Sequence, residues 1–336
     1  MIAVHHGGDL SAATAAFGKP ADGWVDLSTG INPRPWPVDT KVLDGLIYLP
    51  DSARIDDLIR AAAAAYGAGD PRHIVPAPGT QALIQWLPRL RRPGRVAIVT
   101  PTYGEHAPAW RMAGHEIVET GGLPDPADVD AVVVTNPNNP DGNIVPPGDL
   151  TDLGARLAGK GGLLVVDEAF ADVDPSASVA ASAAASPAIS IDGGVIALRS
   201  FGKFFGLPGL RLGFAVTDIE TARNISAALG PWPVSSIAAE IGAAALADRH
   251  WQSETRAWLG QAARRVDDIL VGAGLRIVGG TDLFRLAETR HAAELYERLG
   301  RLGIYTRAFP ENPGWLRFGL PGPEEHWNRL QQAMAP

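Results

Sequence analysis

Residues 200–216 read SFGKFFGLPGLRLGFAV, a lysine set among glycines and phenylalanines and followed by a strand-like run. A solvated surface lysine does not require glycine and phenylalanine neighbours. A lysine reacts with a carbonyl group only when its neutral amine is accessible, which requires a desolvating pocket or neighbours that lower its pKa. Taken alone, Lys203 also fits an ordinary side chain that buries its stem and exposes its charge. The rest of the chain decides between the two interpretations.

Apolar runs rich in β-branched residues predict buried strands at 95–100, 131–136, 162–168, 194–200 and 211–216. Helical patterns lie between several of them, at 55–67, 80–90, 104–114 and 146–159. Strands that alternate with helices predict a mostly parallel sheet covered on both faces. The expected fold class is therefore α/β, with a three-layer α/β/α large domain and a small C-terminal α+β domain.

The chain divides into four predicted parts, which are an N-terminal arm (1–35) packed with the small domain, a large domain (36–233), long linking helices (234–271) and a small domain (272–336). Many prolines and glycines in the first 50 residues predict an extended arm. The Ala/Ser-rich segment 175–190 predicts a surface helix or connection.

Composition excludes several classes of protein. The 336 residues suffice for a large α/β unit, and the apolar runs fall short of a membrane span. The absence of cysteine excludes disulfides, thiolate metal sites and cysteine nucleophiles. A net charge of −8 argues against a nucleic-acid surface but is compatible with small anionic ligands. The N-terminus lacks a signal or transit pattern, so we expect a cytoplasmic protein without metal, membrane or nucleic-acid partners.

Two residues near Lys203 are suited to binding phosphate. Ser200 lies three residues before the lysine and Arg211 eight after it. A hydroxyl and a guanidinium can together meet one dianionic phosphate beside the amine.

Two polar residues follow predicted strands. Asp167 ends the strand in GLLVVDEAF, at the sheet edge where α/β proteins bind ligands. It fits either a helix cap or ion pair, or the partner of a pyridinium nitrogen. Asn139, in TNPNNPDG, fits either a tight turn or a donor to a ring oxygen.

A glycine-led helix start and an aromatic complete the series. Gly79, Thr80 and Gln81 can present backbone amides to a phosphate, although many helices begin this way. Tyr103 follows another strand, where its ring can either stack on a flat heterocycle or pack in the core. Each signal alone is modest. Chance does not readily produce all of them in this order, each beside a strand.

Together these motifs resemble the fold type I pyridoxal-phosphate enzymes of the aspartate aminotransferase superfamily, over nearly the whole chain. The resemblance implies that Lys203 forms the Schiff base with pyridoxal 5′-phosphate, that Asp167 pairs with the pyridine nitrogen and that Tyr103 stacks on the ring as a third catalytic residue. The other residues that it implies for the cofactor are Asn139 at the ring oxygen and Gly79, Thr80, Gln81, Ser200 and Arg211 at the phosphate.

Two further features bear on this resemblance. Tyr48, in IYLPDS, resembles the tyrosine that family members lend to the neighbouring subunit's cofactor phosphate, which implies a homodimer with shared sites. Phe170 departs from the family, because many relatives have a tyrosine three residues after the aspartate. A shifted pKa of the lysine imine is the expected consequence, with the fold unaffected.

The N-terminal segments HHGGD (5–9) and DLSTGINPRPWP (26–37) resemble those of threonine-phosphate decarboxylases, a sister group of histidinol-phosphate aminotransferases. The substrate-binding residues that this likeness implies are His6, Gly7, Gly8 and Asn32 over the substrate phosphate, with Asn139, and Arg307 and Arg317 as anion-binding arginines. Without the likeness, His6 reads as a surface histidine and such arginines as surface ion-pair partners.

The implied reaction is decarboxylation of L-threonine O-3-phosphate to (R)-1-amino-2-propanol O-2-phosphate, in cobalamin biosynthesis. Transamination of a phosphorylated amine such as histidinol phosphate is the alternative, because the same residues serve both reactions and the choice depends on the N-terminal likeness. A catalytically silent binding or regulatory module is a third hypothesis. The presence of Lys203, Asp167 and Arg211 speaks against it.

Overall fold

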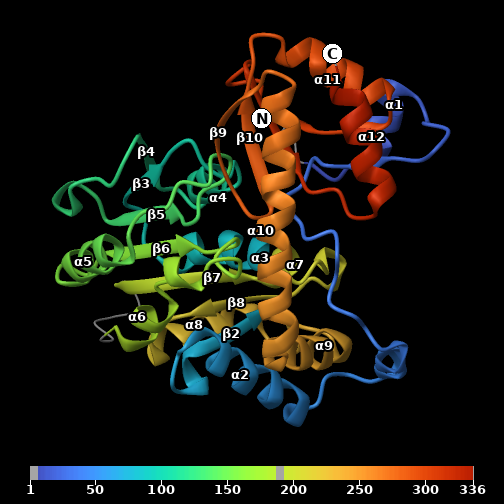
Figure 1. The fold of residues 1–336 in the computed structure, drawn as a ribbon. Helices are drawn as coiled ribbons and strands as arrows, with labels where there is room; N and C mark the ends of the chain where they lie inside the picture. The colour runs from blue at the N-terminus through green and yellow to red at the C-terminus, as the bar shows by residue number, and fades with distance from the viewer. Residues whose placement is uncertain (1–6, 187–192, 336) are drawn as a thin grey trace. The chain divides into compact units, whose positions relative to one another are not determined.

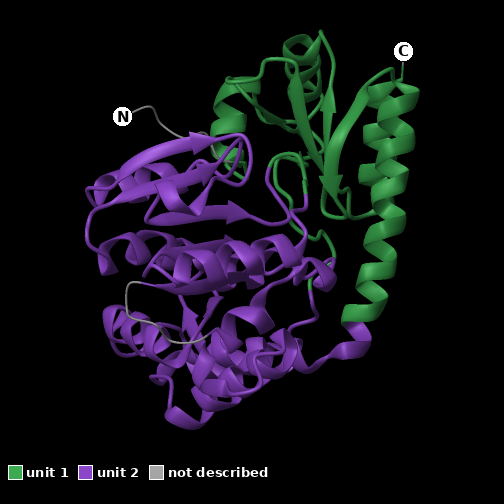
Figure 2. Ribbon diagram, turned by 90° about the vertical axis from the view of Figure 1, so that its left-hand side faces the viewer, with its two compact units in different colours: residues 1–35, 140–143, 252–336 green, residues 36–139, 144–251 purple. Residues whose placement is uncertain are grey.

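The computed structural model describes residues 7–186 and 193–335, and its chain divides into two compact units (Figures 1 and 2). Within the described residues, unit 1 comprises 7–35, 140–143 and 252–335. Unit 2 comprises 36–139, 144–186 and 193–251. Unit 1 thus draws on both ends of the chain and on a short insertion from its middle.

Unit 2 is built on a sheet with seven strands in the described part of the chain, in the order β2-β8-β7-β6-β5-β3-β4. The strands are β2 (Ile74–Ala77), β3 (Arg95–Val99), β4 (Glu116–Thr120), β5 (Ala131–Thr135), β6 (Leu163–Asp167), β7 (Gly194–Ser200) and β8 (Gly213–Val216). Strand β8 runs antiparallel to both of its neighbours, and the other neighbouring pairs are parallel. The predicted mostly parallel sheet is confirmed.

Burial explains which strands were visible in the sequence. Every residue of β5 and β6 is buried, and a strand covered on both faces reads as a continuous apolar run. The two strands that the sequence did not reveal, β2 and β4, lie at the two edges of the sheet. Strand β4 is partly exposed and carries two glutamates, and β2 contains a proline, which is tolerated at an edge.

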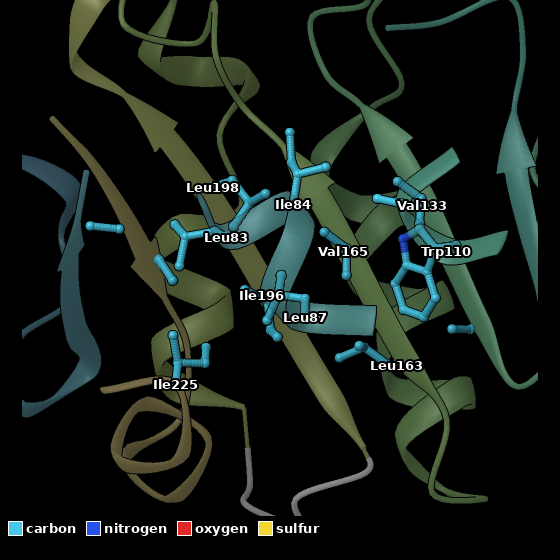
Figure 3. Close-up of a cluster of buried hydrophobic side chains, with 14 of the residues drawn as sticks. Leu83, Ile84, Leu87, Trp110, Val133, Leu163, Val165, Ile196, Leu198 and Ile225 are labelled. Carbon is cyan, nitrogen blue, oxygen red and sulfur yellow. The ribbon is translucent and has the colours of Figure 1, made fainter. Parts of the chain in front are cut away.

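Helices cover both faces of this sheet. Helices α3 (Thr80–Trp86), α4 (His106–Met112) and α8 (Ile219–Leu229) cover one face, where Figure 3 shows Leu83, Trp110 and Ile225 against Val165 and Ile196. On the other face, Gly154 of α5 (Pro147–Ala158) lies against Leu164 and Val195, whose side chains alternate with those of Val165 and Ile196. The predicted three-layer arrangement is therefore present in unit 2.

The remaining elements of unit 2 are short or lie around the sheet. The helices are α2 (Ser52–Tyr66), α6 (Ala180–Ala185), α7 (Phe201–Phe204) and α9 (Ser236–Ala247), and the 3-10 turns are η1 (Thr40–Ile47), η2 (Pro71–His73), η3 (Leu87–Leu90), η4 (Pro126–Asp128), η5 (Pro175–Ala177) and η6 (Pro208–Leu210). Helix α2 shows how the sequence sets such bounds. Asp51 caps its start by accepting from Arg54 N, and Gly67, with φ 69°, ends it in the left-handed region.

Unit 1 contains a sheet with four strands among the described residues, in the order β12-β13-β10-β9, all antiparallel. A short parallel pair, β1 with β11, lies in the same unit. The elements are α1 (Leu10–Phe17), β1 (Val25–Asp26), β9 (Arg276–Thr281), β10 (Phe284–Glu288), α11 (Ala292–Arg301), β11 (Ile304–Tyr305), β12 (Arg307–Ala308), β13 (Trp315–Gly319) and α12 (Glu324–Met334). Helix α10 (Arg249–Gly272) begins in unit 2 and continues in unit 1.

One segment differs from its predicted character, and a second contains a helix as predicted. The first 50 residues hold helix α1 and turn η1 in addition to extended chain, because Asp9 and Asp39 accept from backbone amides at their starts. Within 175–190, helix α6 forms and buries its alanines on one face. No helix among the described residues is both long and apolar enough to span a membrane.

Candidate active site

The predicted cofactor residues of unit 2 lie at one end of the sheet, the end at which the parallel strands finish. Asp167, the last residue of β6, is level with Thr135 of β5 and Leu198 of β7. Ser200 ends β7 opposite Gly213, and Gly213 is also opposite Ala77, which ends β2 just before Gly79. The end of the sheet that carries the Asp167 carboxylate therefore also carries both predicted phosphate-binding segments, as expected of an α/β ligand site.

Asp167 is held by a histidine that the sequence reasoning missed. His106 Nε2 lies 3.0 Å from Asp167 Oδ2, and both side chains are buried. An ionised carboxylate only accepts, so Nε2 carries the proton and donates. The other oxygen, Oδ1, accepts from Ala169 N at 3.2 Å. The sequence offers only that His106 stands three residues after Tyr103, at the start of α4.

A chain of hydrogen bonds fixes Tyr103. Its hydroxyl donates to Gln81 Oε1 at 3.2 Å, and Gln81 Nε2 donates to Glu105 Oε2 at 3.4 Å. Burial, with the charges of Glu105 and Asp167, raises the pKa of Tyr103 to about 12. Tyr103 therefore stays a neutral donor at physiological pH. The ring also meets His106 edge-on, at a centroid distance of 5.9 Å.

The glycine-led start of α3 packs against Arg211. A Cβ placed at Gly79 would lie 2.6 Å from Arg211 Nη2, and Gly79 has a φ of 82°. Arg211 itself adopts a left-handed backbone with φ 54°, which is uncommon for a residue with a side chain. Gly213 approaches as closely, since its Cβ would lie 2.6 Å from Thr80 N. A guanidinium thus lies beside a helix N-terminus, an arrangement that suits an anion.

Lys203 lies on α7, directly after β7, and is half-buried. Its Nζ is 5.9 Å from the centre of the Phe170 ring, near the outer limit of a cation–π contact. Phe201 stacks on Phe205 at 4.3 Å, and a Cβ on Gly202 would lie 2.9 Å from Pro208 Cα. The residues that flank Lys203 in the chain are therefore tightly packed, and the Phe170 ring lies near the amine.

The turn after β5 is pinned by two asparagines. The side chain of Asn136 donates to Val145 O and Ala177 O and accepts from Val145 N. Asn138 Nδ2 donates to Pro101 O at 2.8 Å. These bonds fix the backbone that presents Asn139.

A buried ionic cluster lies behind the same strand ends. Glu168 follows Asp167, Arg199 precedes Ser200, and neighbouring residues of a strand point to opposite faces. Arg199 Nη1 donates to Glu168 Oε2 at 2.8 Å, and Nη2 contacts Asp172. Burial raises the pKa of Glu168, against the opposing effect of Arg199. This cluster, also unforeseen, ties β6 and β7 together beneath the candidate site.

Most of the predicted substrate residues that the structure describes lie in unit 1, where two arginines face each other, whereas Asn139 belongs to unit 2. Arg307 of β12 is directly opposite Arg317 of β13. Arg317 is only 7% exposed, and burial, together with the charge of Arg307, lowers its pKa to about 10. Burial lowers the pKa of Arg307 as well. Like charges opposite each other destabilise a sheet, so the pair favours a bound anion.

The other predicted substrate residues of unit 1 lie near its N-terminal segment. Asn32 is buried, and its Oδ1 accepts from Arg34 N at 2.9 Å. Gly8 N donates to Ser28 Oγ, and Gly7 approaches Ser28 O. His6 lies outside the described residues. Tyr48, in unit 2, is 62% exposed at the end of η1, and its carbonyl accepts from Ser236 Oγ.

Comparison with known proteins gives a consistent assignment. The model of the family "Aminotransferase class I and II" matches residues 48–333. The threonine-phosphate decarboxylase of Pseudomonas aeruginosa is 42% identical over 98% of this chain and 97% of its own length, and that of a Sinorhizobium species is 42% identical over 99% and 98%. The crystal structure of histidinol-phosphate aminotransferase from Sinorhizobium meliloti, in complex with pyridoxal 5′-phosphate, has a TM-score of 0.77 at 21% identity, covering 96% of this chain and 93% of that one.

Proposed function

We propose, from the premise that this chain belongs to the aminotransferase class I and II family, that it is a pyridoxal-phosphate-dependent threonine-phosphate decarboxylase. It would convert L-threonine O-3-phosphate into (R)-1-amino-2-propanol O-2-phosphate and carbon dioxide. The observation that carries the proposal is 42% identity, over essentially the full length of both chains, to the Pseudomonas aeruginosa enzyme of that name.

The residues at the sheet edge fit the cofactor. The α3 start, Ser200 and Arg211 supply the donors and positive charge that suit a phosphate, and a side chain at Gly79 would collide with Arg211. Asp167 is a buried carboxylate suited to a protonated ring nitrogen, and Lys203 is a half-buried amine on the helix that follows β7. When bound, pyridoxal 5′-phosphate supplies an electron-withdrawing ring that accepts the electron pair left when a bond to Cα breaks.

In this proposal the Asp167 carboxylate holds the proton on the ring nitrogen, and His106 keeps that carboxylate oriented. Tyr103, neutral because of its raised pKa, presents its ring as a stacking surface. Asn139 would donate to the ring oxygen. Phe170 has no hydroxyl for that oxygen, so this donation falls to Asn139 rather than to the residue three places after Asp167.

The Nζ of Lys203 would hold the cofactor and would be the group available to protonate Cα. Decarboxylation would require the protein to orient the bond to the Cα carboxylate, rather than Cα–H, for cleavage. We assign that carboxylate to the Arg307–Arg317 pair, and the substrate phosphate to the N-terminal residues His6, Gly7, Gly8 and Asn32. Binding energy from the phosphate can then fix the orientation of the reacting bond.

The test is to incubate the purified protein with cofactor and threonine phosphate, measure carbon dioxide and identify the amine product. Release of carbon dioxide in step with 1-amino-2-propanol phosphate supports the proposal. No carbon dioxide, with transfer of an amino group from histidinol phosphate to 2-oxoglutarate, would replace it by the aminotransferase alternative. Neither activity, in a protein that borohydride cannot trap at Lys203, would favour a silent module.

A homodimer belongs to the same proposal. Residues 43–49 expose Leu43, Leu46, Ile47 and Leu49 beside Tyr48, an apolar surface that a second copy would cover. Tyr48 would then reach the partner's cofactor phosphate. Sedimentation of the holoenzyme tests this assembly, and a monomer at micromolar concentration would contradict it. The predicted cytoplasmic location and the four-part domain division stay predictions.

A further inference from the structure

Ser28 lies at a crossing point of unit 1. The segment that carries it runs between two strands, since Leu27 N donates to Tyr305 O of β11 and Gly319 N of β13 donates to Leu27 O, both at 2.7 Å. Ser28 is fully buried. Its backbone is therefore fixed from both sides, and neither its carbonyl nor its hydroxyl can turn to solvent.

The carbonyl oxygen of Ser28 accepts a hydrogen bond from the buried Arg317. Arg317 Nη2 donates to Ser28 O at 2.8 Å. This bond directs the guanidinium of Arg317 along the 25–29 segment. This oxygen therefore helps to set the position of the predicted anion-binding arginine.

The same oxygen is in contact with the N-terminal glycines. A Cβ placed at Gly7 would lie 2.3 Å from Ser28 O, closer than any side chain tolerates, so only glycine fits without displacing the carbonyl. Gly8 N donates to Ser28 Oγ at 2.7 Å. Both glycines are thus held against the residue that Arg317 contacts.

The hydroxyl of Ser28 has a defined orientation. It donates its only proton to Asp26 Oδ1 at 2.6 Å, which leaves its lone pairs for Gly8 N. Ser28 N donates to the same Asp26 oxygen at 2.9 Å. A charged acceptor makes these bonds stronger than neutral ones. Asp26 therefore locks the hydroxyl in the orientation that can accept from the glycine segment.

We propose that Ser28 is a positioning residue of the substrate site, which holds the Gly7–Gly8 segment and Arg317 in a fixed relation through its hydroxyl and its carbonyl. The inference rests on the proposed function, in which these two elements bind the phosphate and the carboxylate of one substrate. Asp26 supports the role by orienting the hydroxyl. Ser28 fixes the spacing between the two anion-binding elements, and thus the substrates that can engage both.

Two variants of the holoenzyme separately disturb the contact of the Ser28 hydroxyl with Gly8 and the contact of the Ser28 carbonyl with Arg317. Ser28→Ala removes the acceptor for Gly8 N and leaves the carbonyl. Gly7→Ala keeps the hydroxyl but pushes a methyl group onto the carbonyl that Arg317 contacts. The matched controls are Thr14→Ala, which removes another hydroxyl of the N-terminal segment, bonded to Trp24 and Leu10, and Gly272→Ala, where a Cβ meets open space.

The first readout needs no substrate. Hydrogen exchange at the N-terminal peptide that contains the Gly8 amide should be faster in Ser28→Ala than in wild type and unchanged in Gly272→Ala. Equal protection in Ser28→Ala and wild type would contradict the proposal that the Ser28 hydroxyl holds the Gly8 amide. This readout does not require that the protein decarboxylate threonine phosphate. Failure of the proposed function and failure of the proposed role of Ser28 can therefore be distinguished.

The second readout separates positioning from general support. Loss of a hydrogen bond of this kind corresponds to about a tenfold change in binding, so KM for threonine phosphate should rise about tenfold in Ser28→Ala while kcat falls less than about threefold. Gly7→Ala should raise KM at least as much, and Thr14→Ala should leave it unchanged. Asp26→Asn keeps an acceptor oxygen and should give a smaller rise than Ser28→Ala. A fall in kcat with unaltered KM in Ser28→Ala would overturn the inference.

Discussion

Replacing His106 tests whether a buried donor sets the chemistry of Asp167. His106→Leu removes the Nε2 donor 3.0 Å from Asp167 Oδ2 and fills the space with carbon. The carboxylate is 3% exposed, so water cannot readily replace the lost donor. A hydrogen bond to a charged group contributes about 1.5–3 kcal/mol, which corresponds to roughly a 10- to 150-fold change in an equilibrium. If Asp167 must stay ionised and oriented to hold the ring proton, kcat should fall within that range.

The assay compares His106→Leu with His106→Gln, whose side-chain amide retains a donor of similar reach. Steady-state decarboxylation and cofactor affinity are measured for both, with thermal unfolding of the proteins as the control for folding. Partial rescue by glutamine, at similar unfolding temperatures, is the expected pattern. Wild-type kcat in His106→Leu would refute the reasoning, as would equal losses in the two variants.

Lys203→Ala should abolish turnover while circular dichroism shows an intact fold, because the amine supplies chemistry more than packing; residual turnover above the uncatalysed rate would contradict its role. Gly79→Ala places a Cβ 2.6 Å from Arg211 at a positive φ, so cofactor affinity measured by titration should fall by about tenfold or more, whereas Gly148→Ala, with open space around its Cβ, should bind normally. Arg199→Met leaves Glu168 and Asp172 buried without their shared cation and should cost about 3–5 kcal/mol in urea unfolding; a loss under about 1 kcal/mol would mean that the cluster contributes little. Because the pKa of Tyr103 is raised, the unfolded chain ionises this phenol from about pH 10 and the folded protein from about pH 12. The free energy of unfolding therefore falls as pH rises through this window. Tyr103→Phe should lose less of this free energy between these pH values than wild type.

The large unit was predictable because its signals are local. Strands β5, β6 and β7 are buried on both faces and read as uninterrupted apolar runs, and helices α2 and α5 carry their own caps or N-terminal proline. Strand β4 was missed because an exposed edge strand such as EIVET lacks that apolar run. Helix α1 was missed because its start depends on one hydrogen bond, from Ala12 N to Asp9, within a glycine-rich stretch.

Site residues were predictable only where the residue type and its local motif indicate the chemistry. Asp167 ends β6 and Lys203 closely follows β7, so their position at one end of the sheet follows from the parallel pairing of these two strands. The α3 start follows β2, a strand that the sequence did not reveal, and only the structure brings it to the same end. Gln81 was assigned from its place in the helix start, but its side chain bonds to Tyr103 and Glu105, a pairing across 22 and 24 residues that no local pattern reports. His106 and Arg199 were missed for the same reason, since Asp167 and Glu168 lie 61 and 31 residues away from them. Ser28 was missed because Gly8 and Arg317, which it joins, lie 20 and 289 residues away.

Strand alternation explains why two short motifs carry both chemistry and stability. In Asp167-Glu168 and Arg199-Ser200, one residue of each pair belongs to the candidate site and the other to the buried cluster on the opposite face. Because the Glu168–Arg199 pair joins β6 to β7, it fixes the relative height of the carboxylate and of the strand that leads into Lys203. A one-residue slip of either strand would exchange the two roles, turning the site residue to the face of the cluster and the ion-pair residue to the face of the site. The register that the buried charges enforce is thus the register that the proposed chemistry needs.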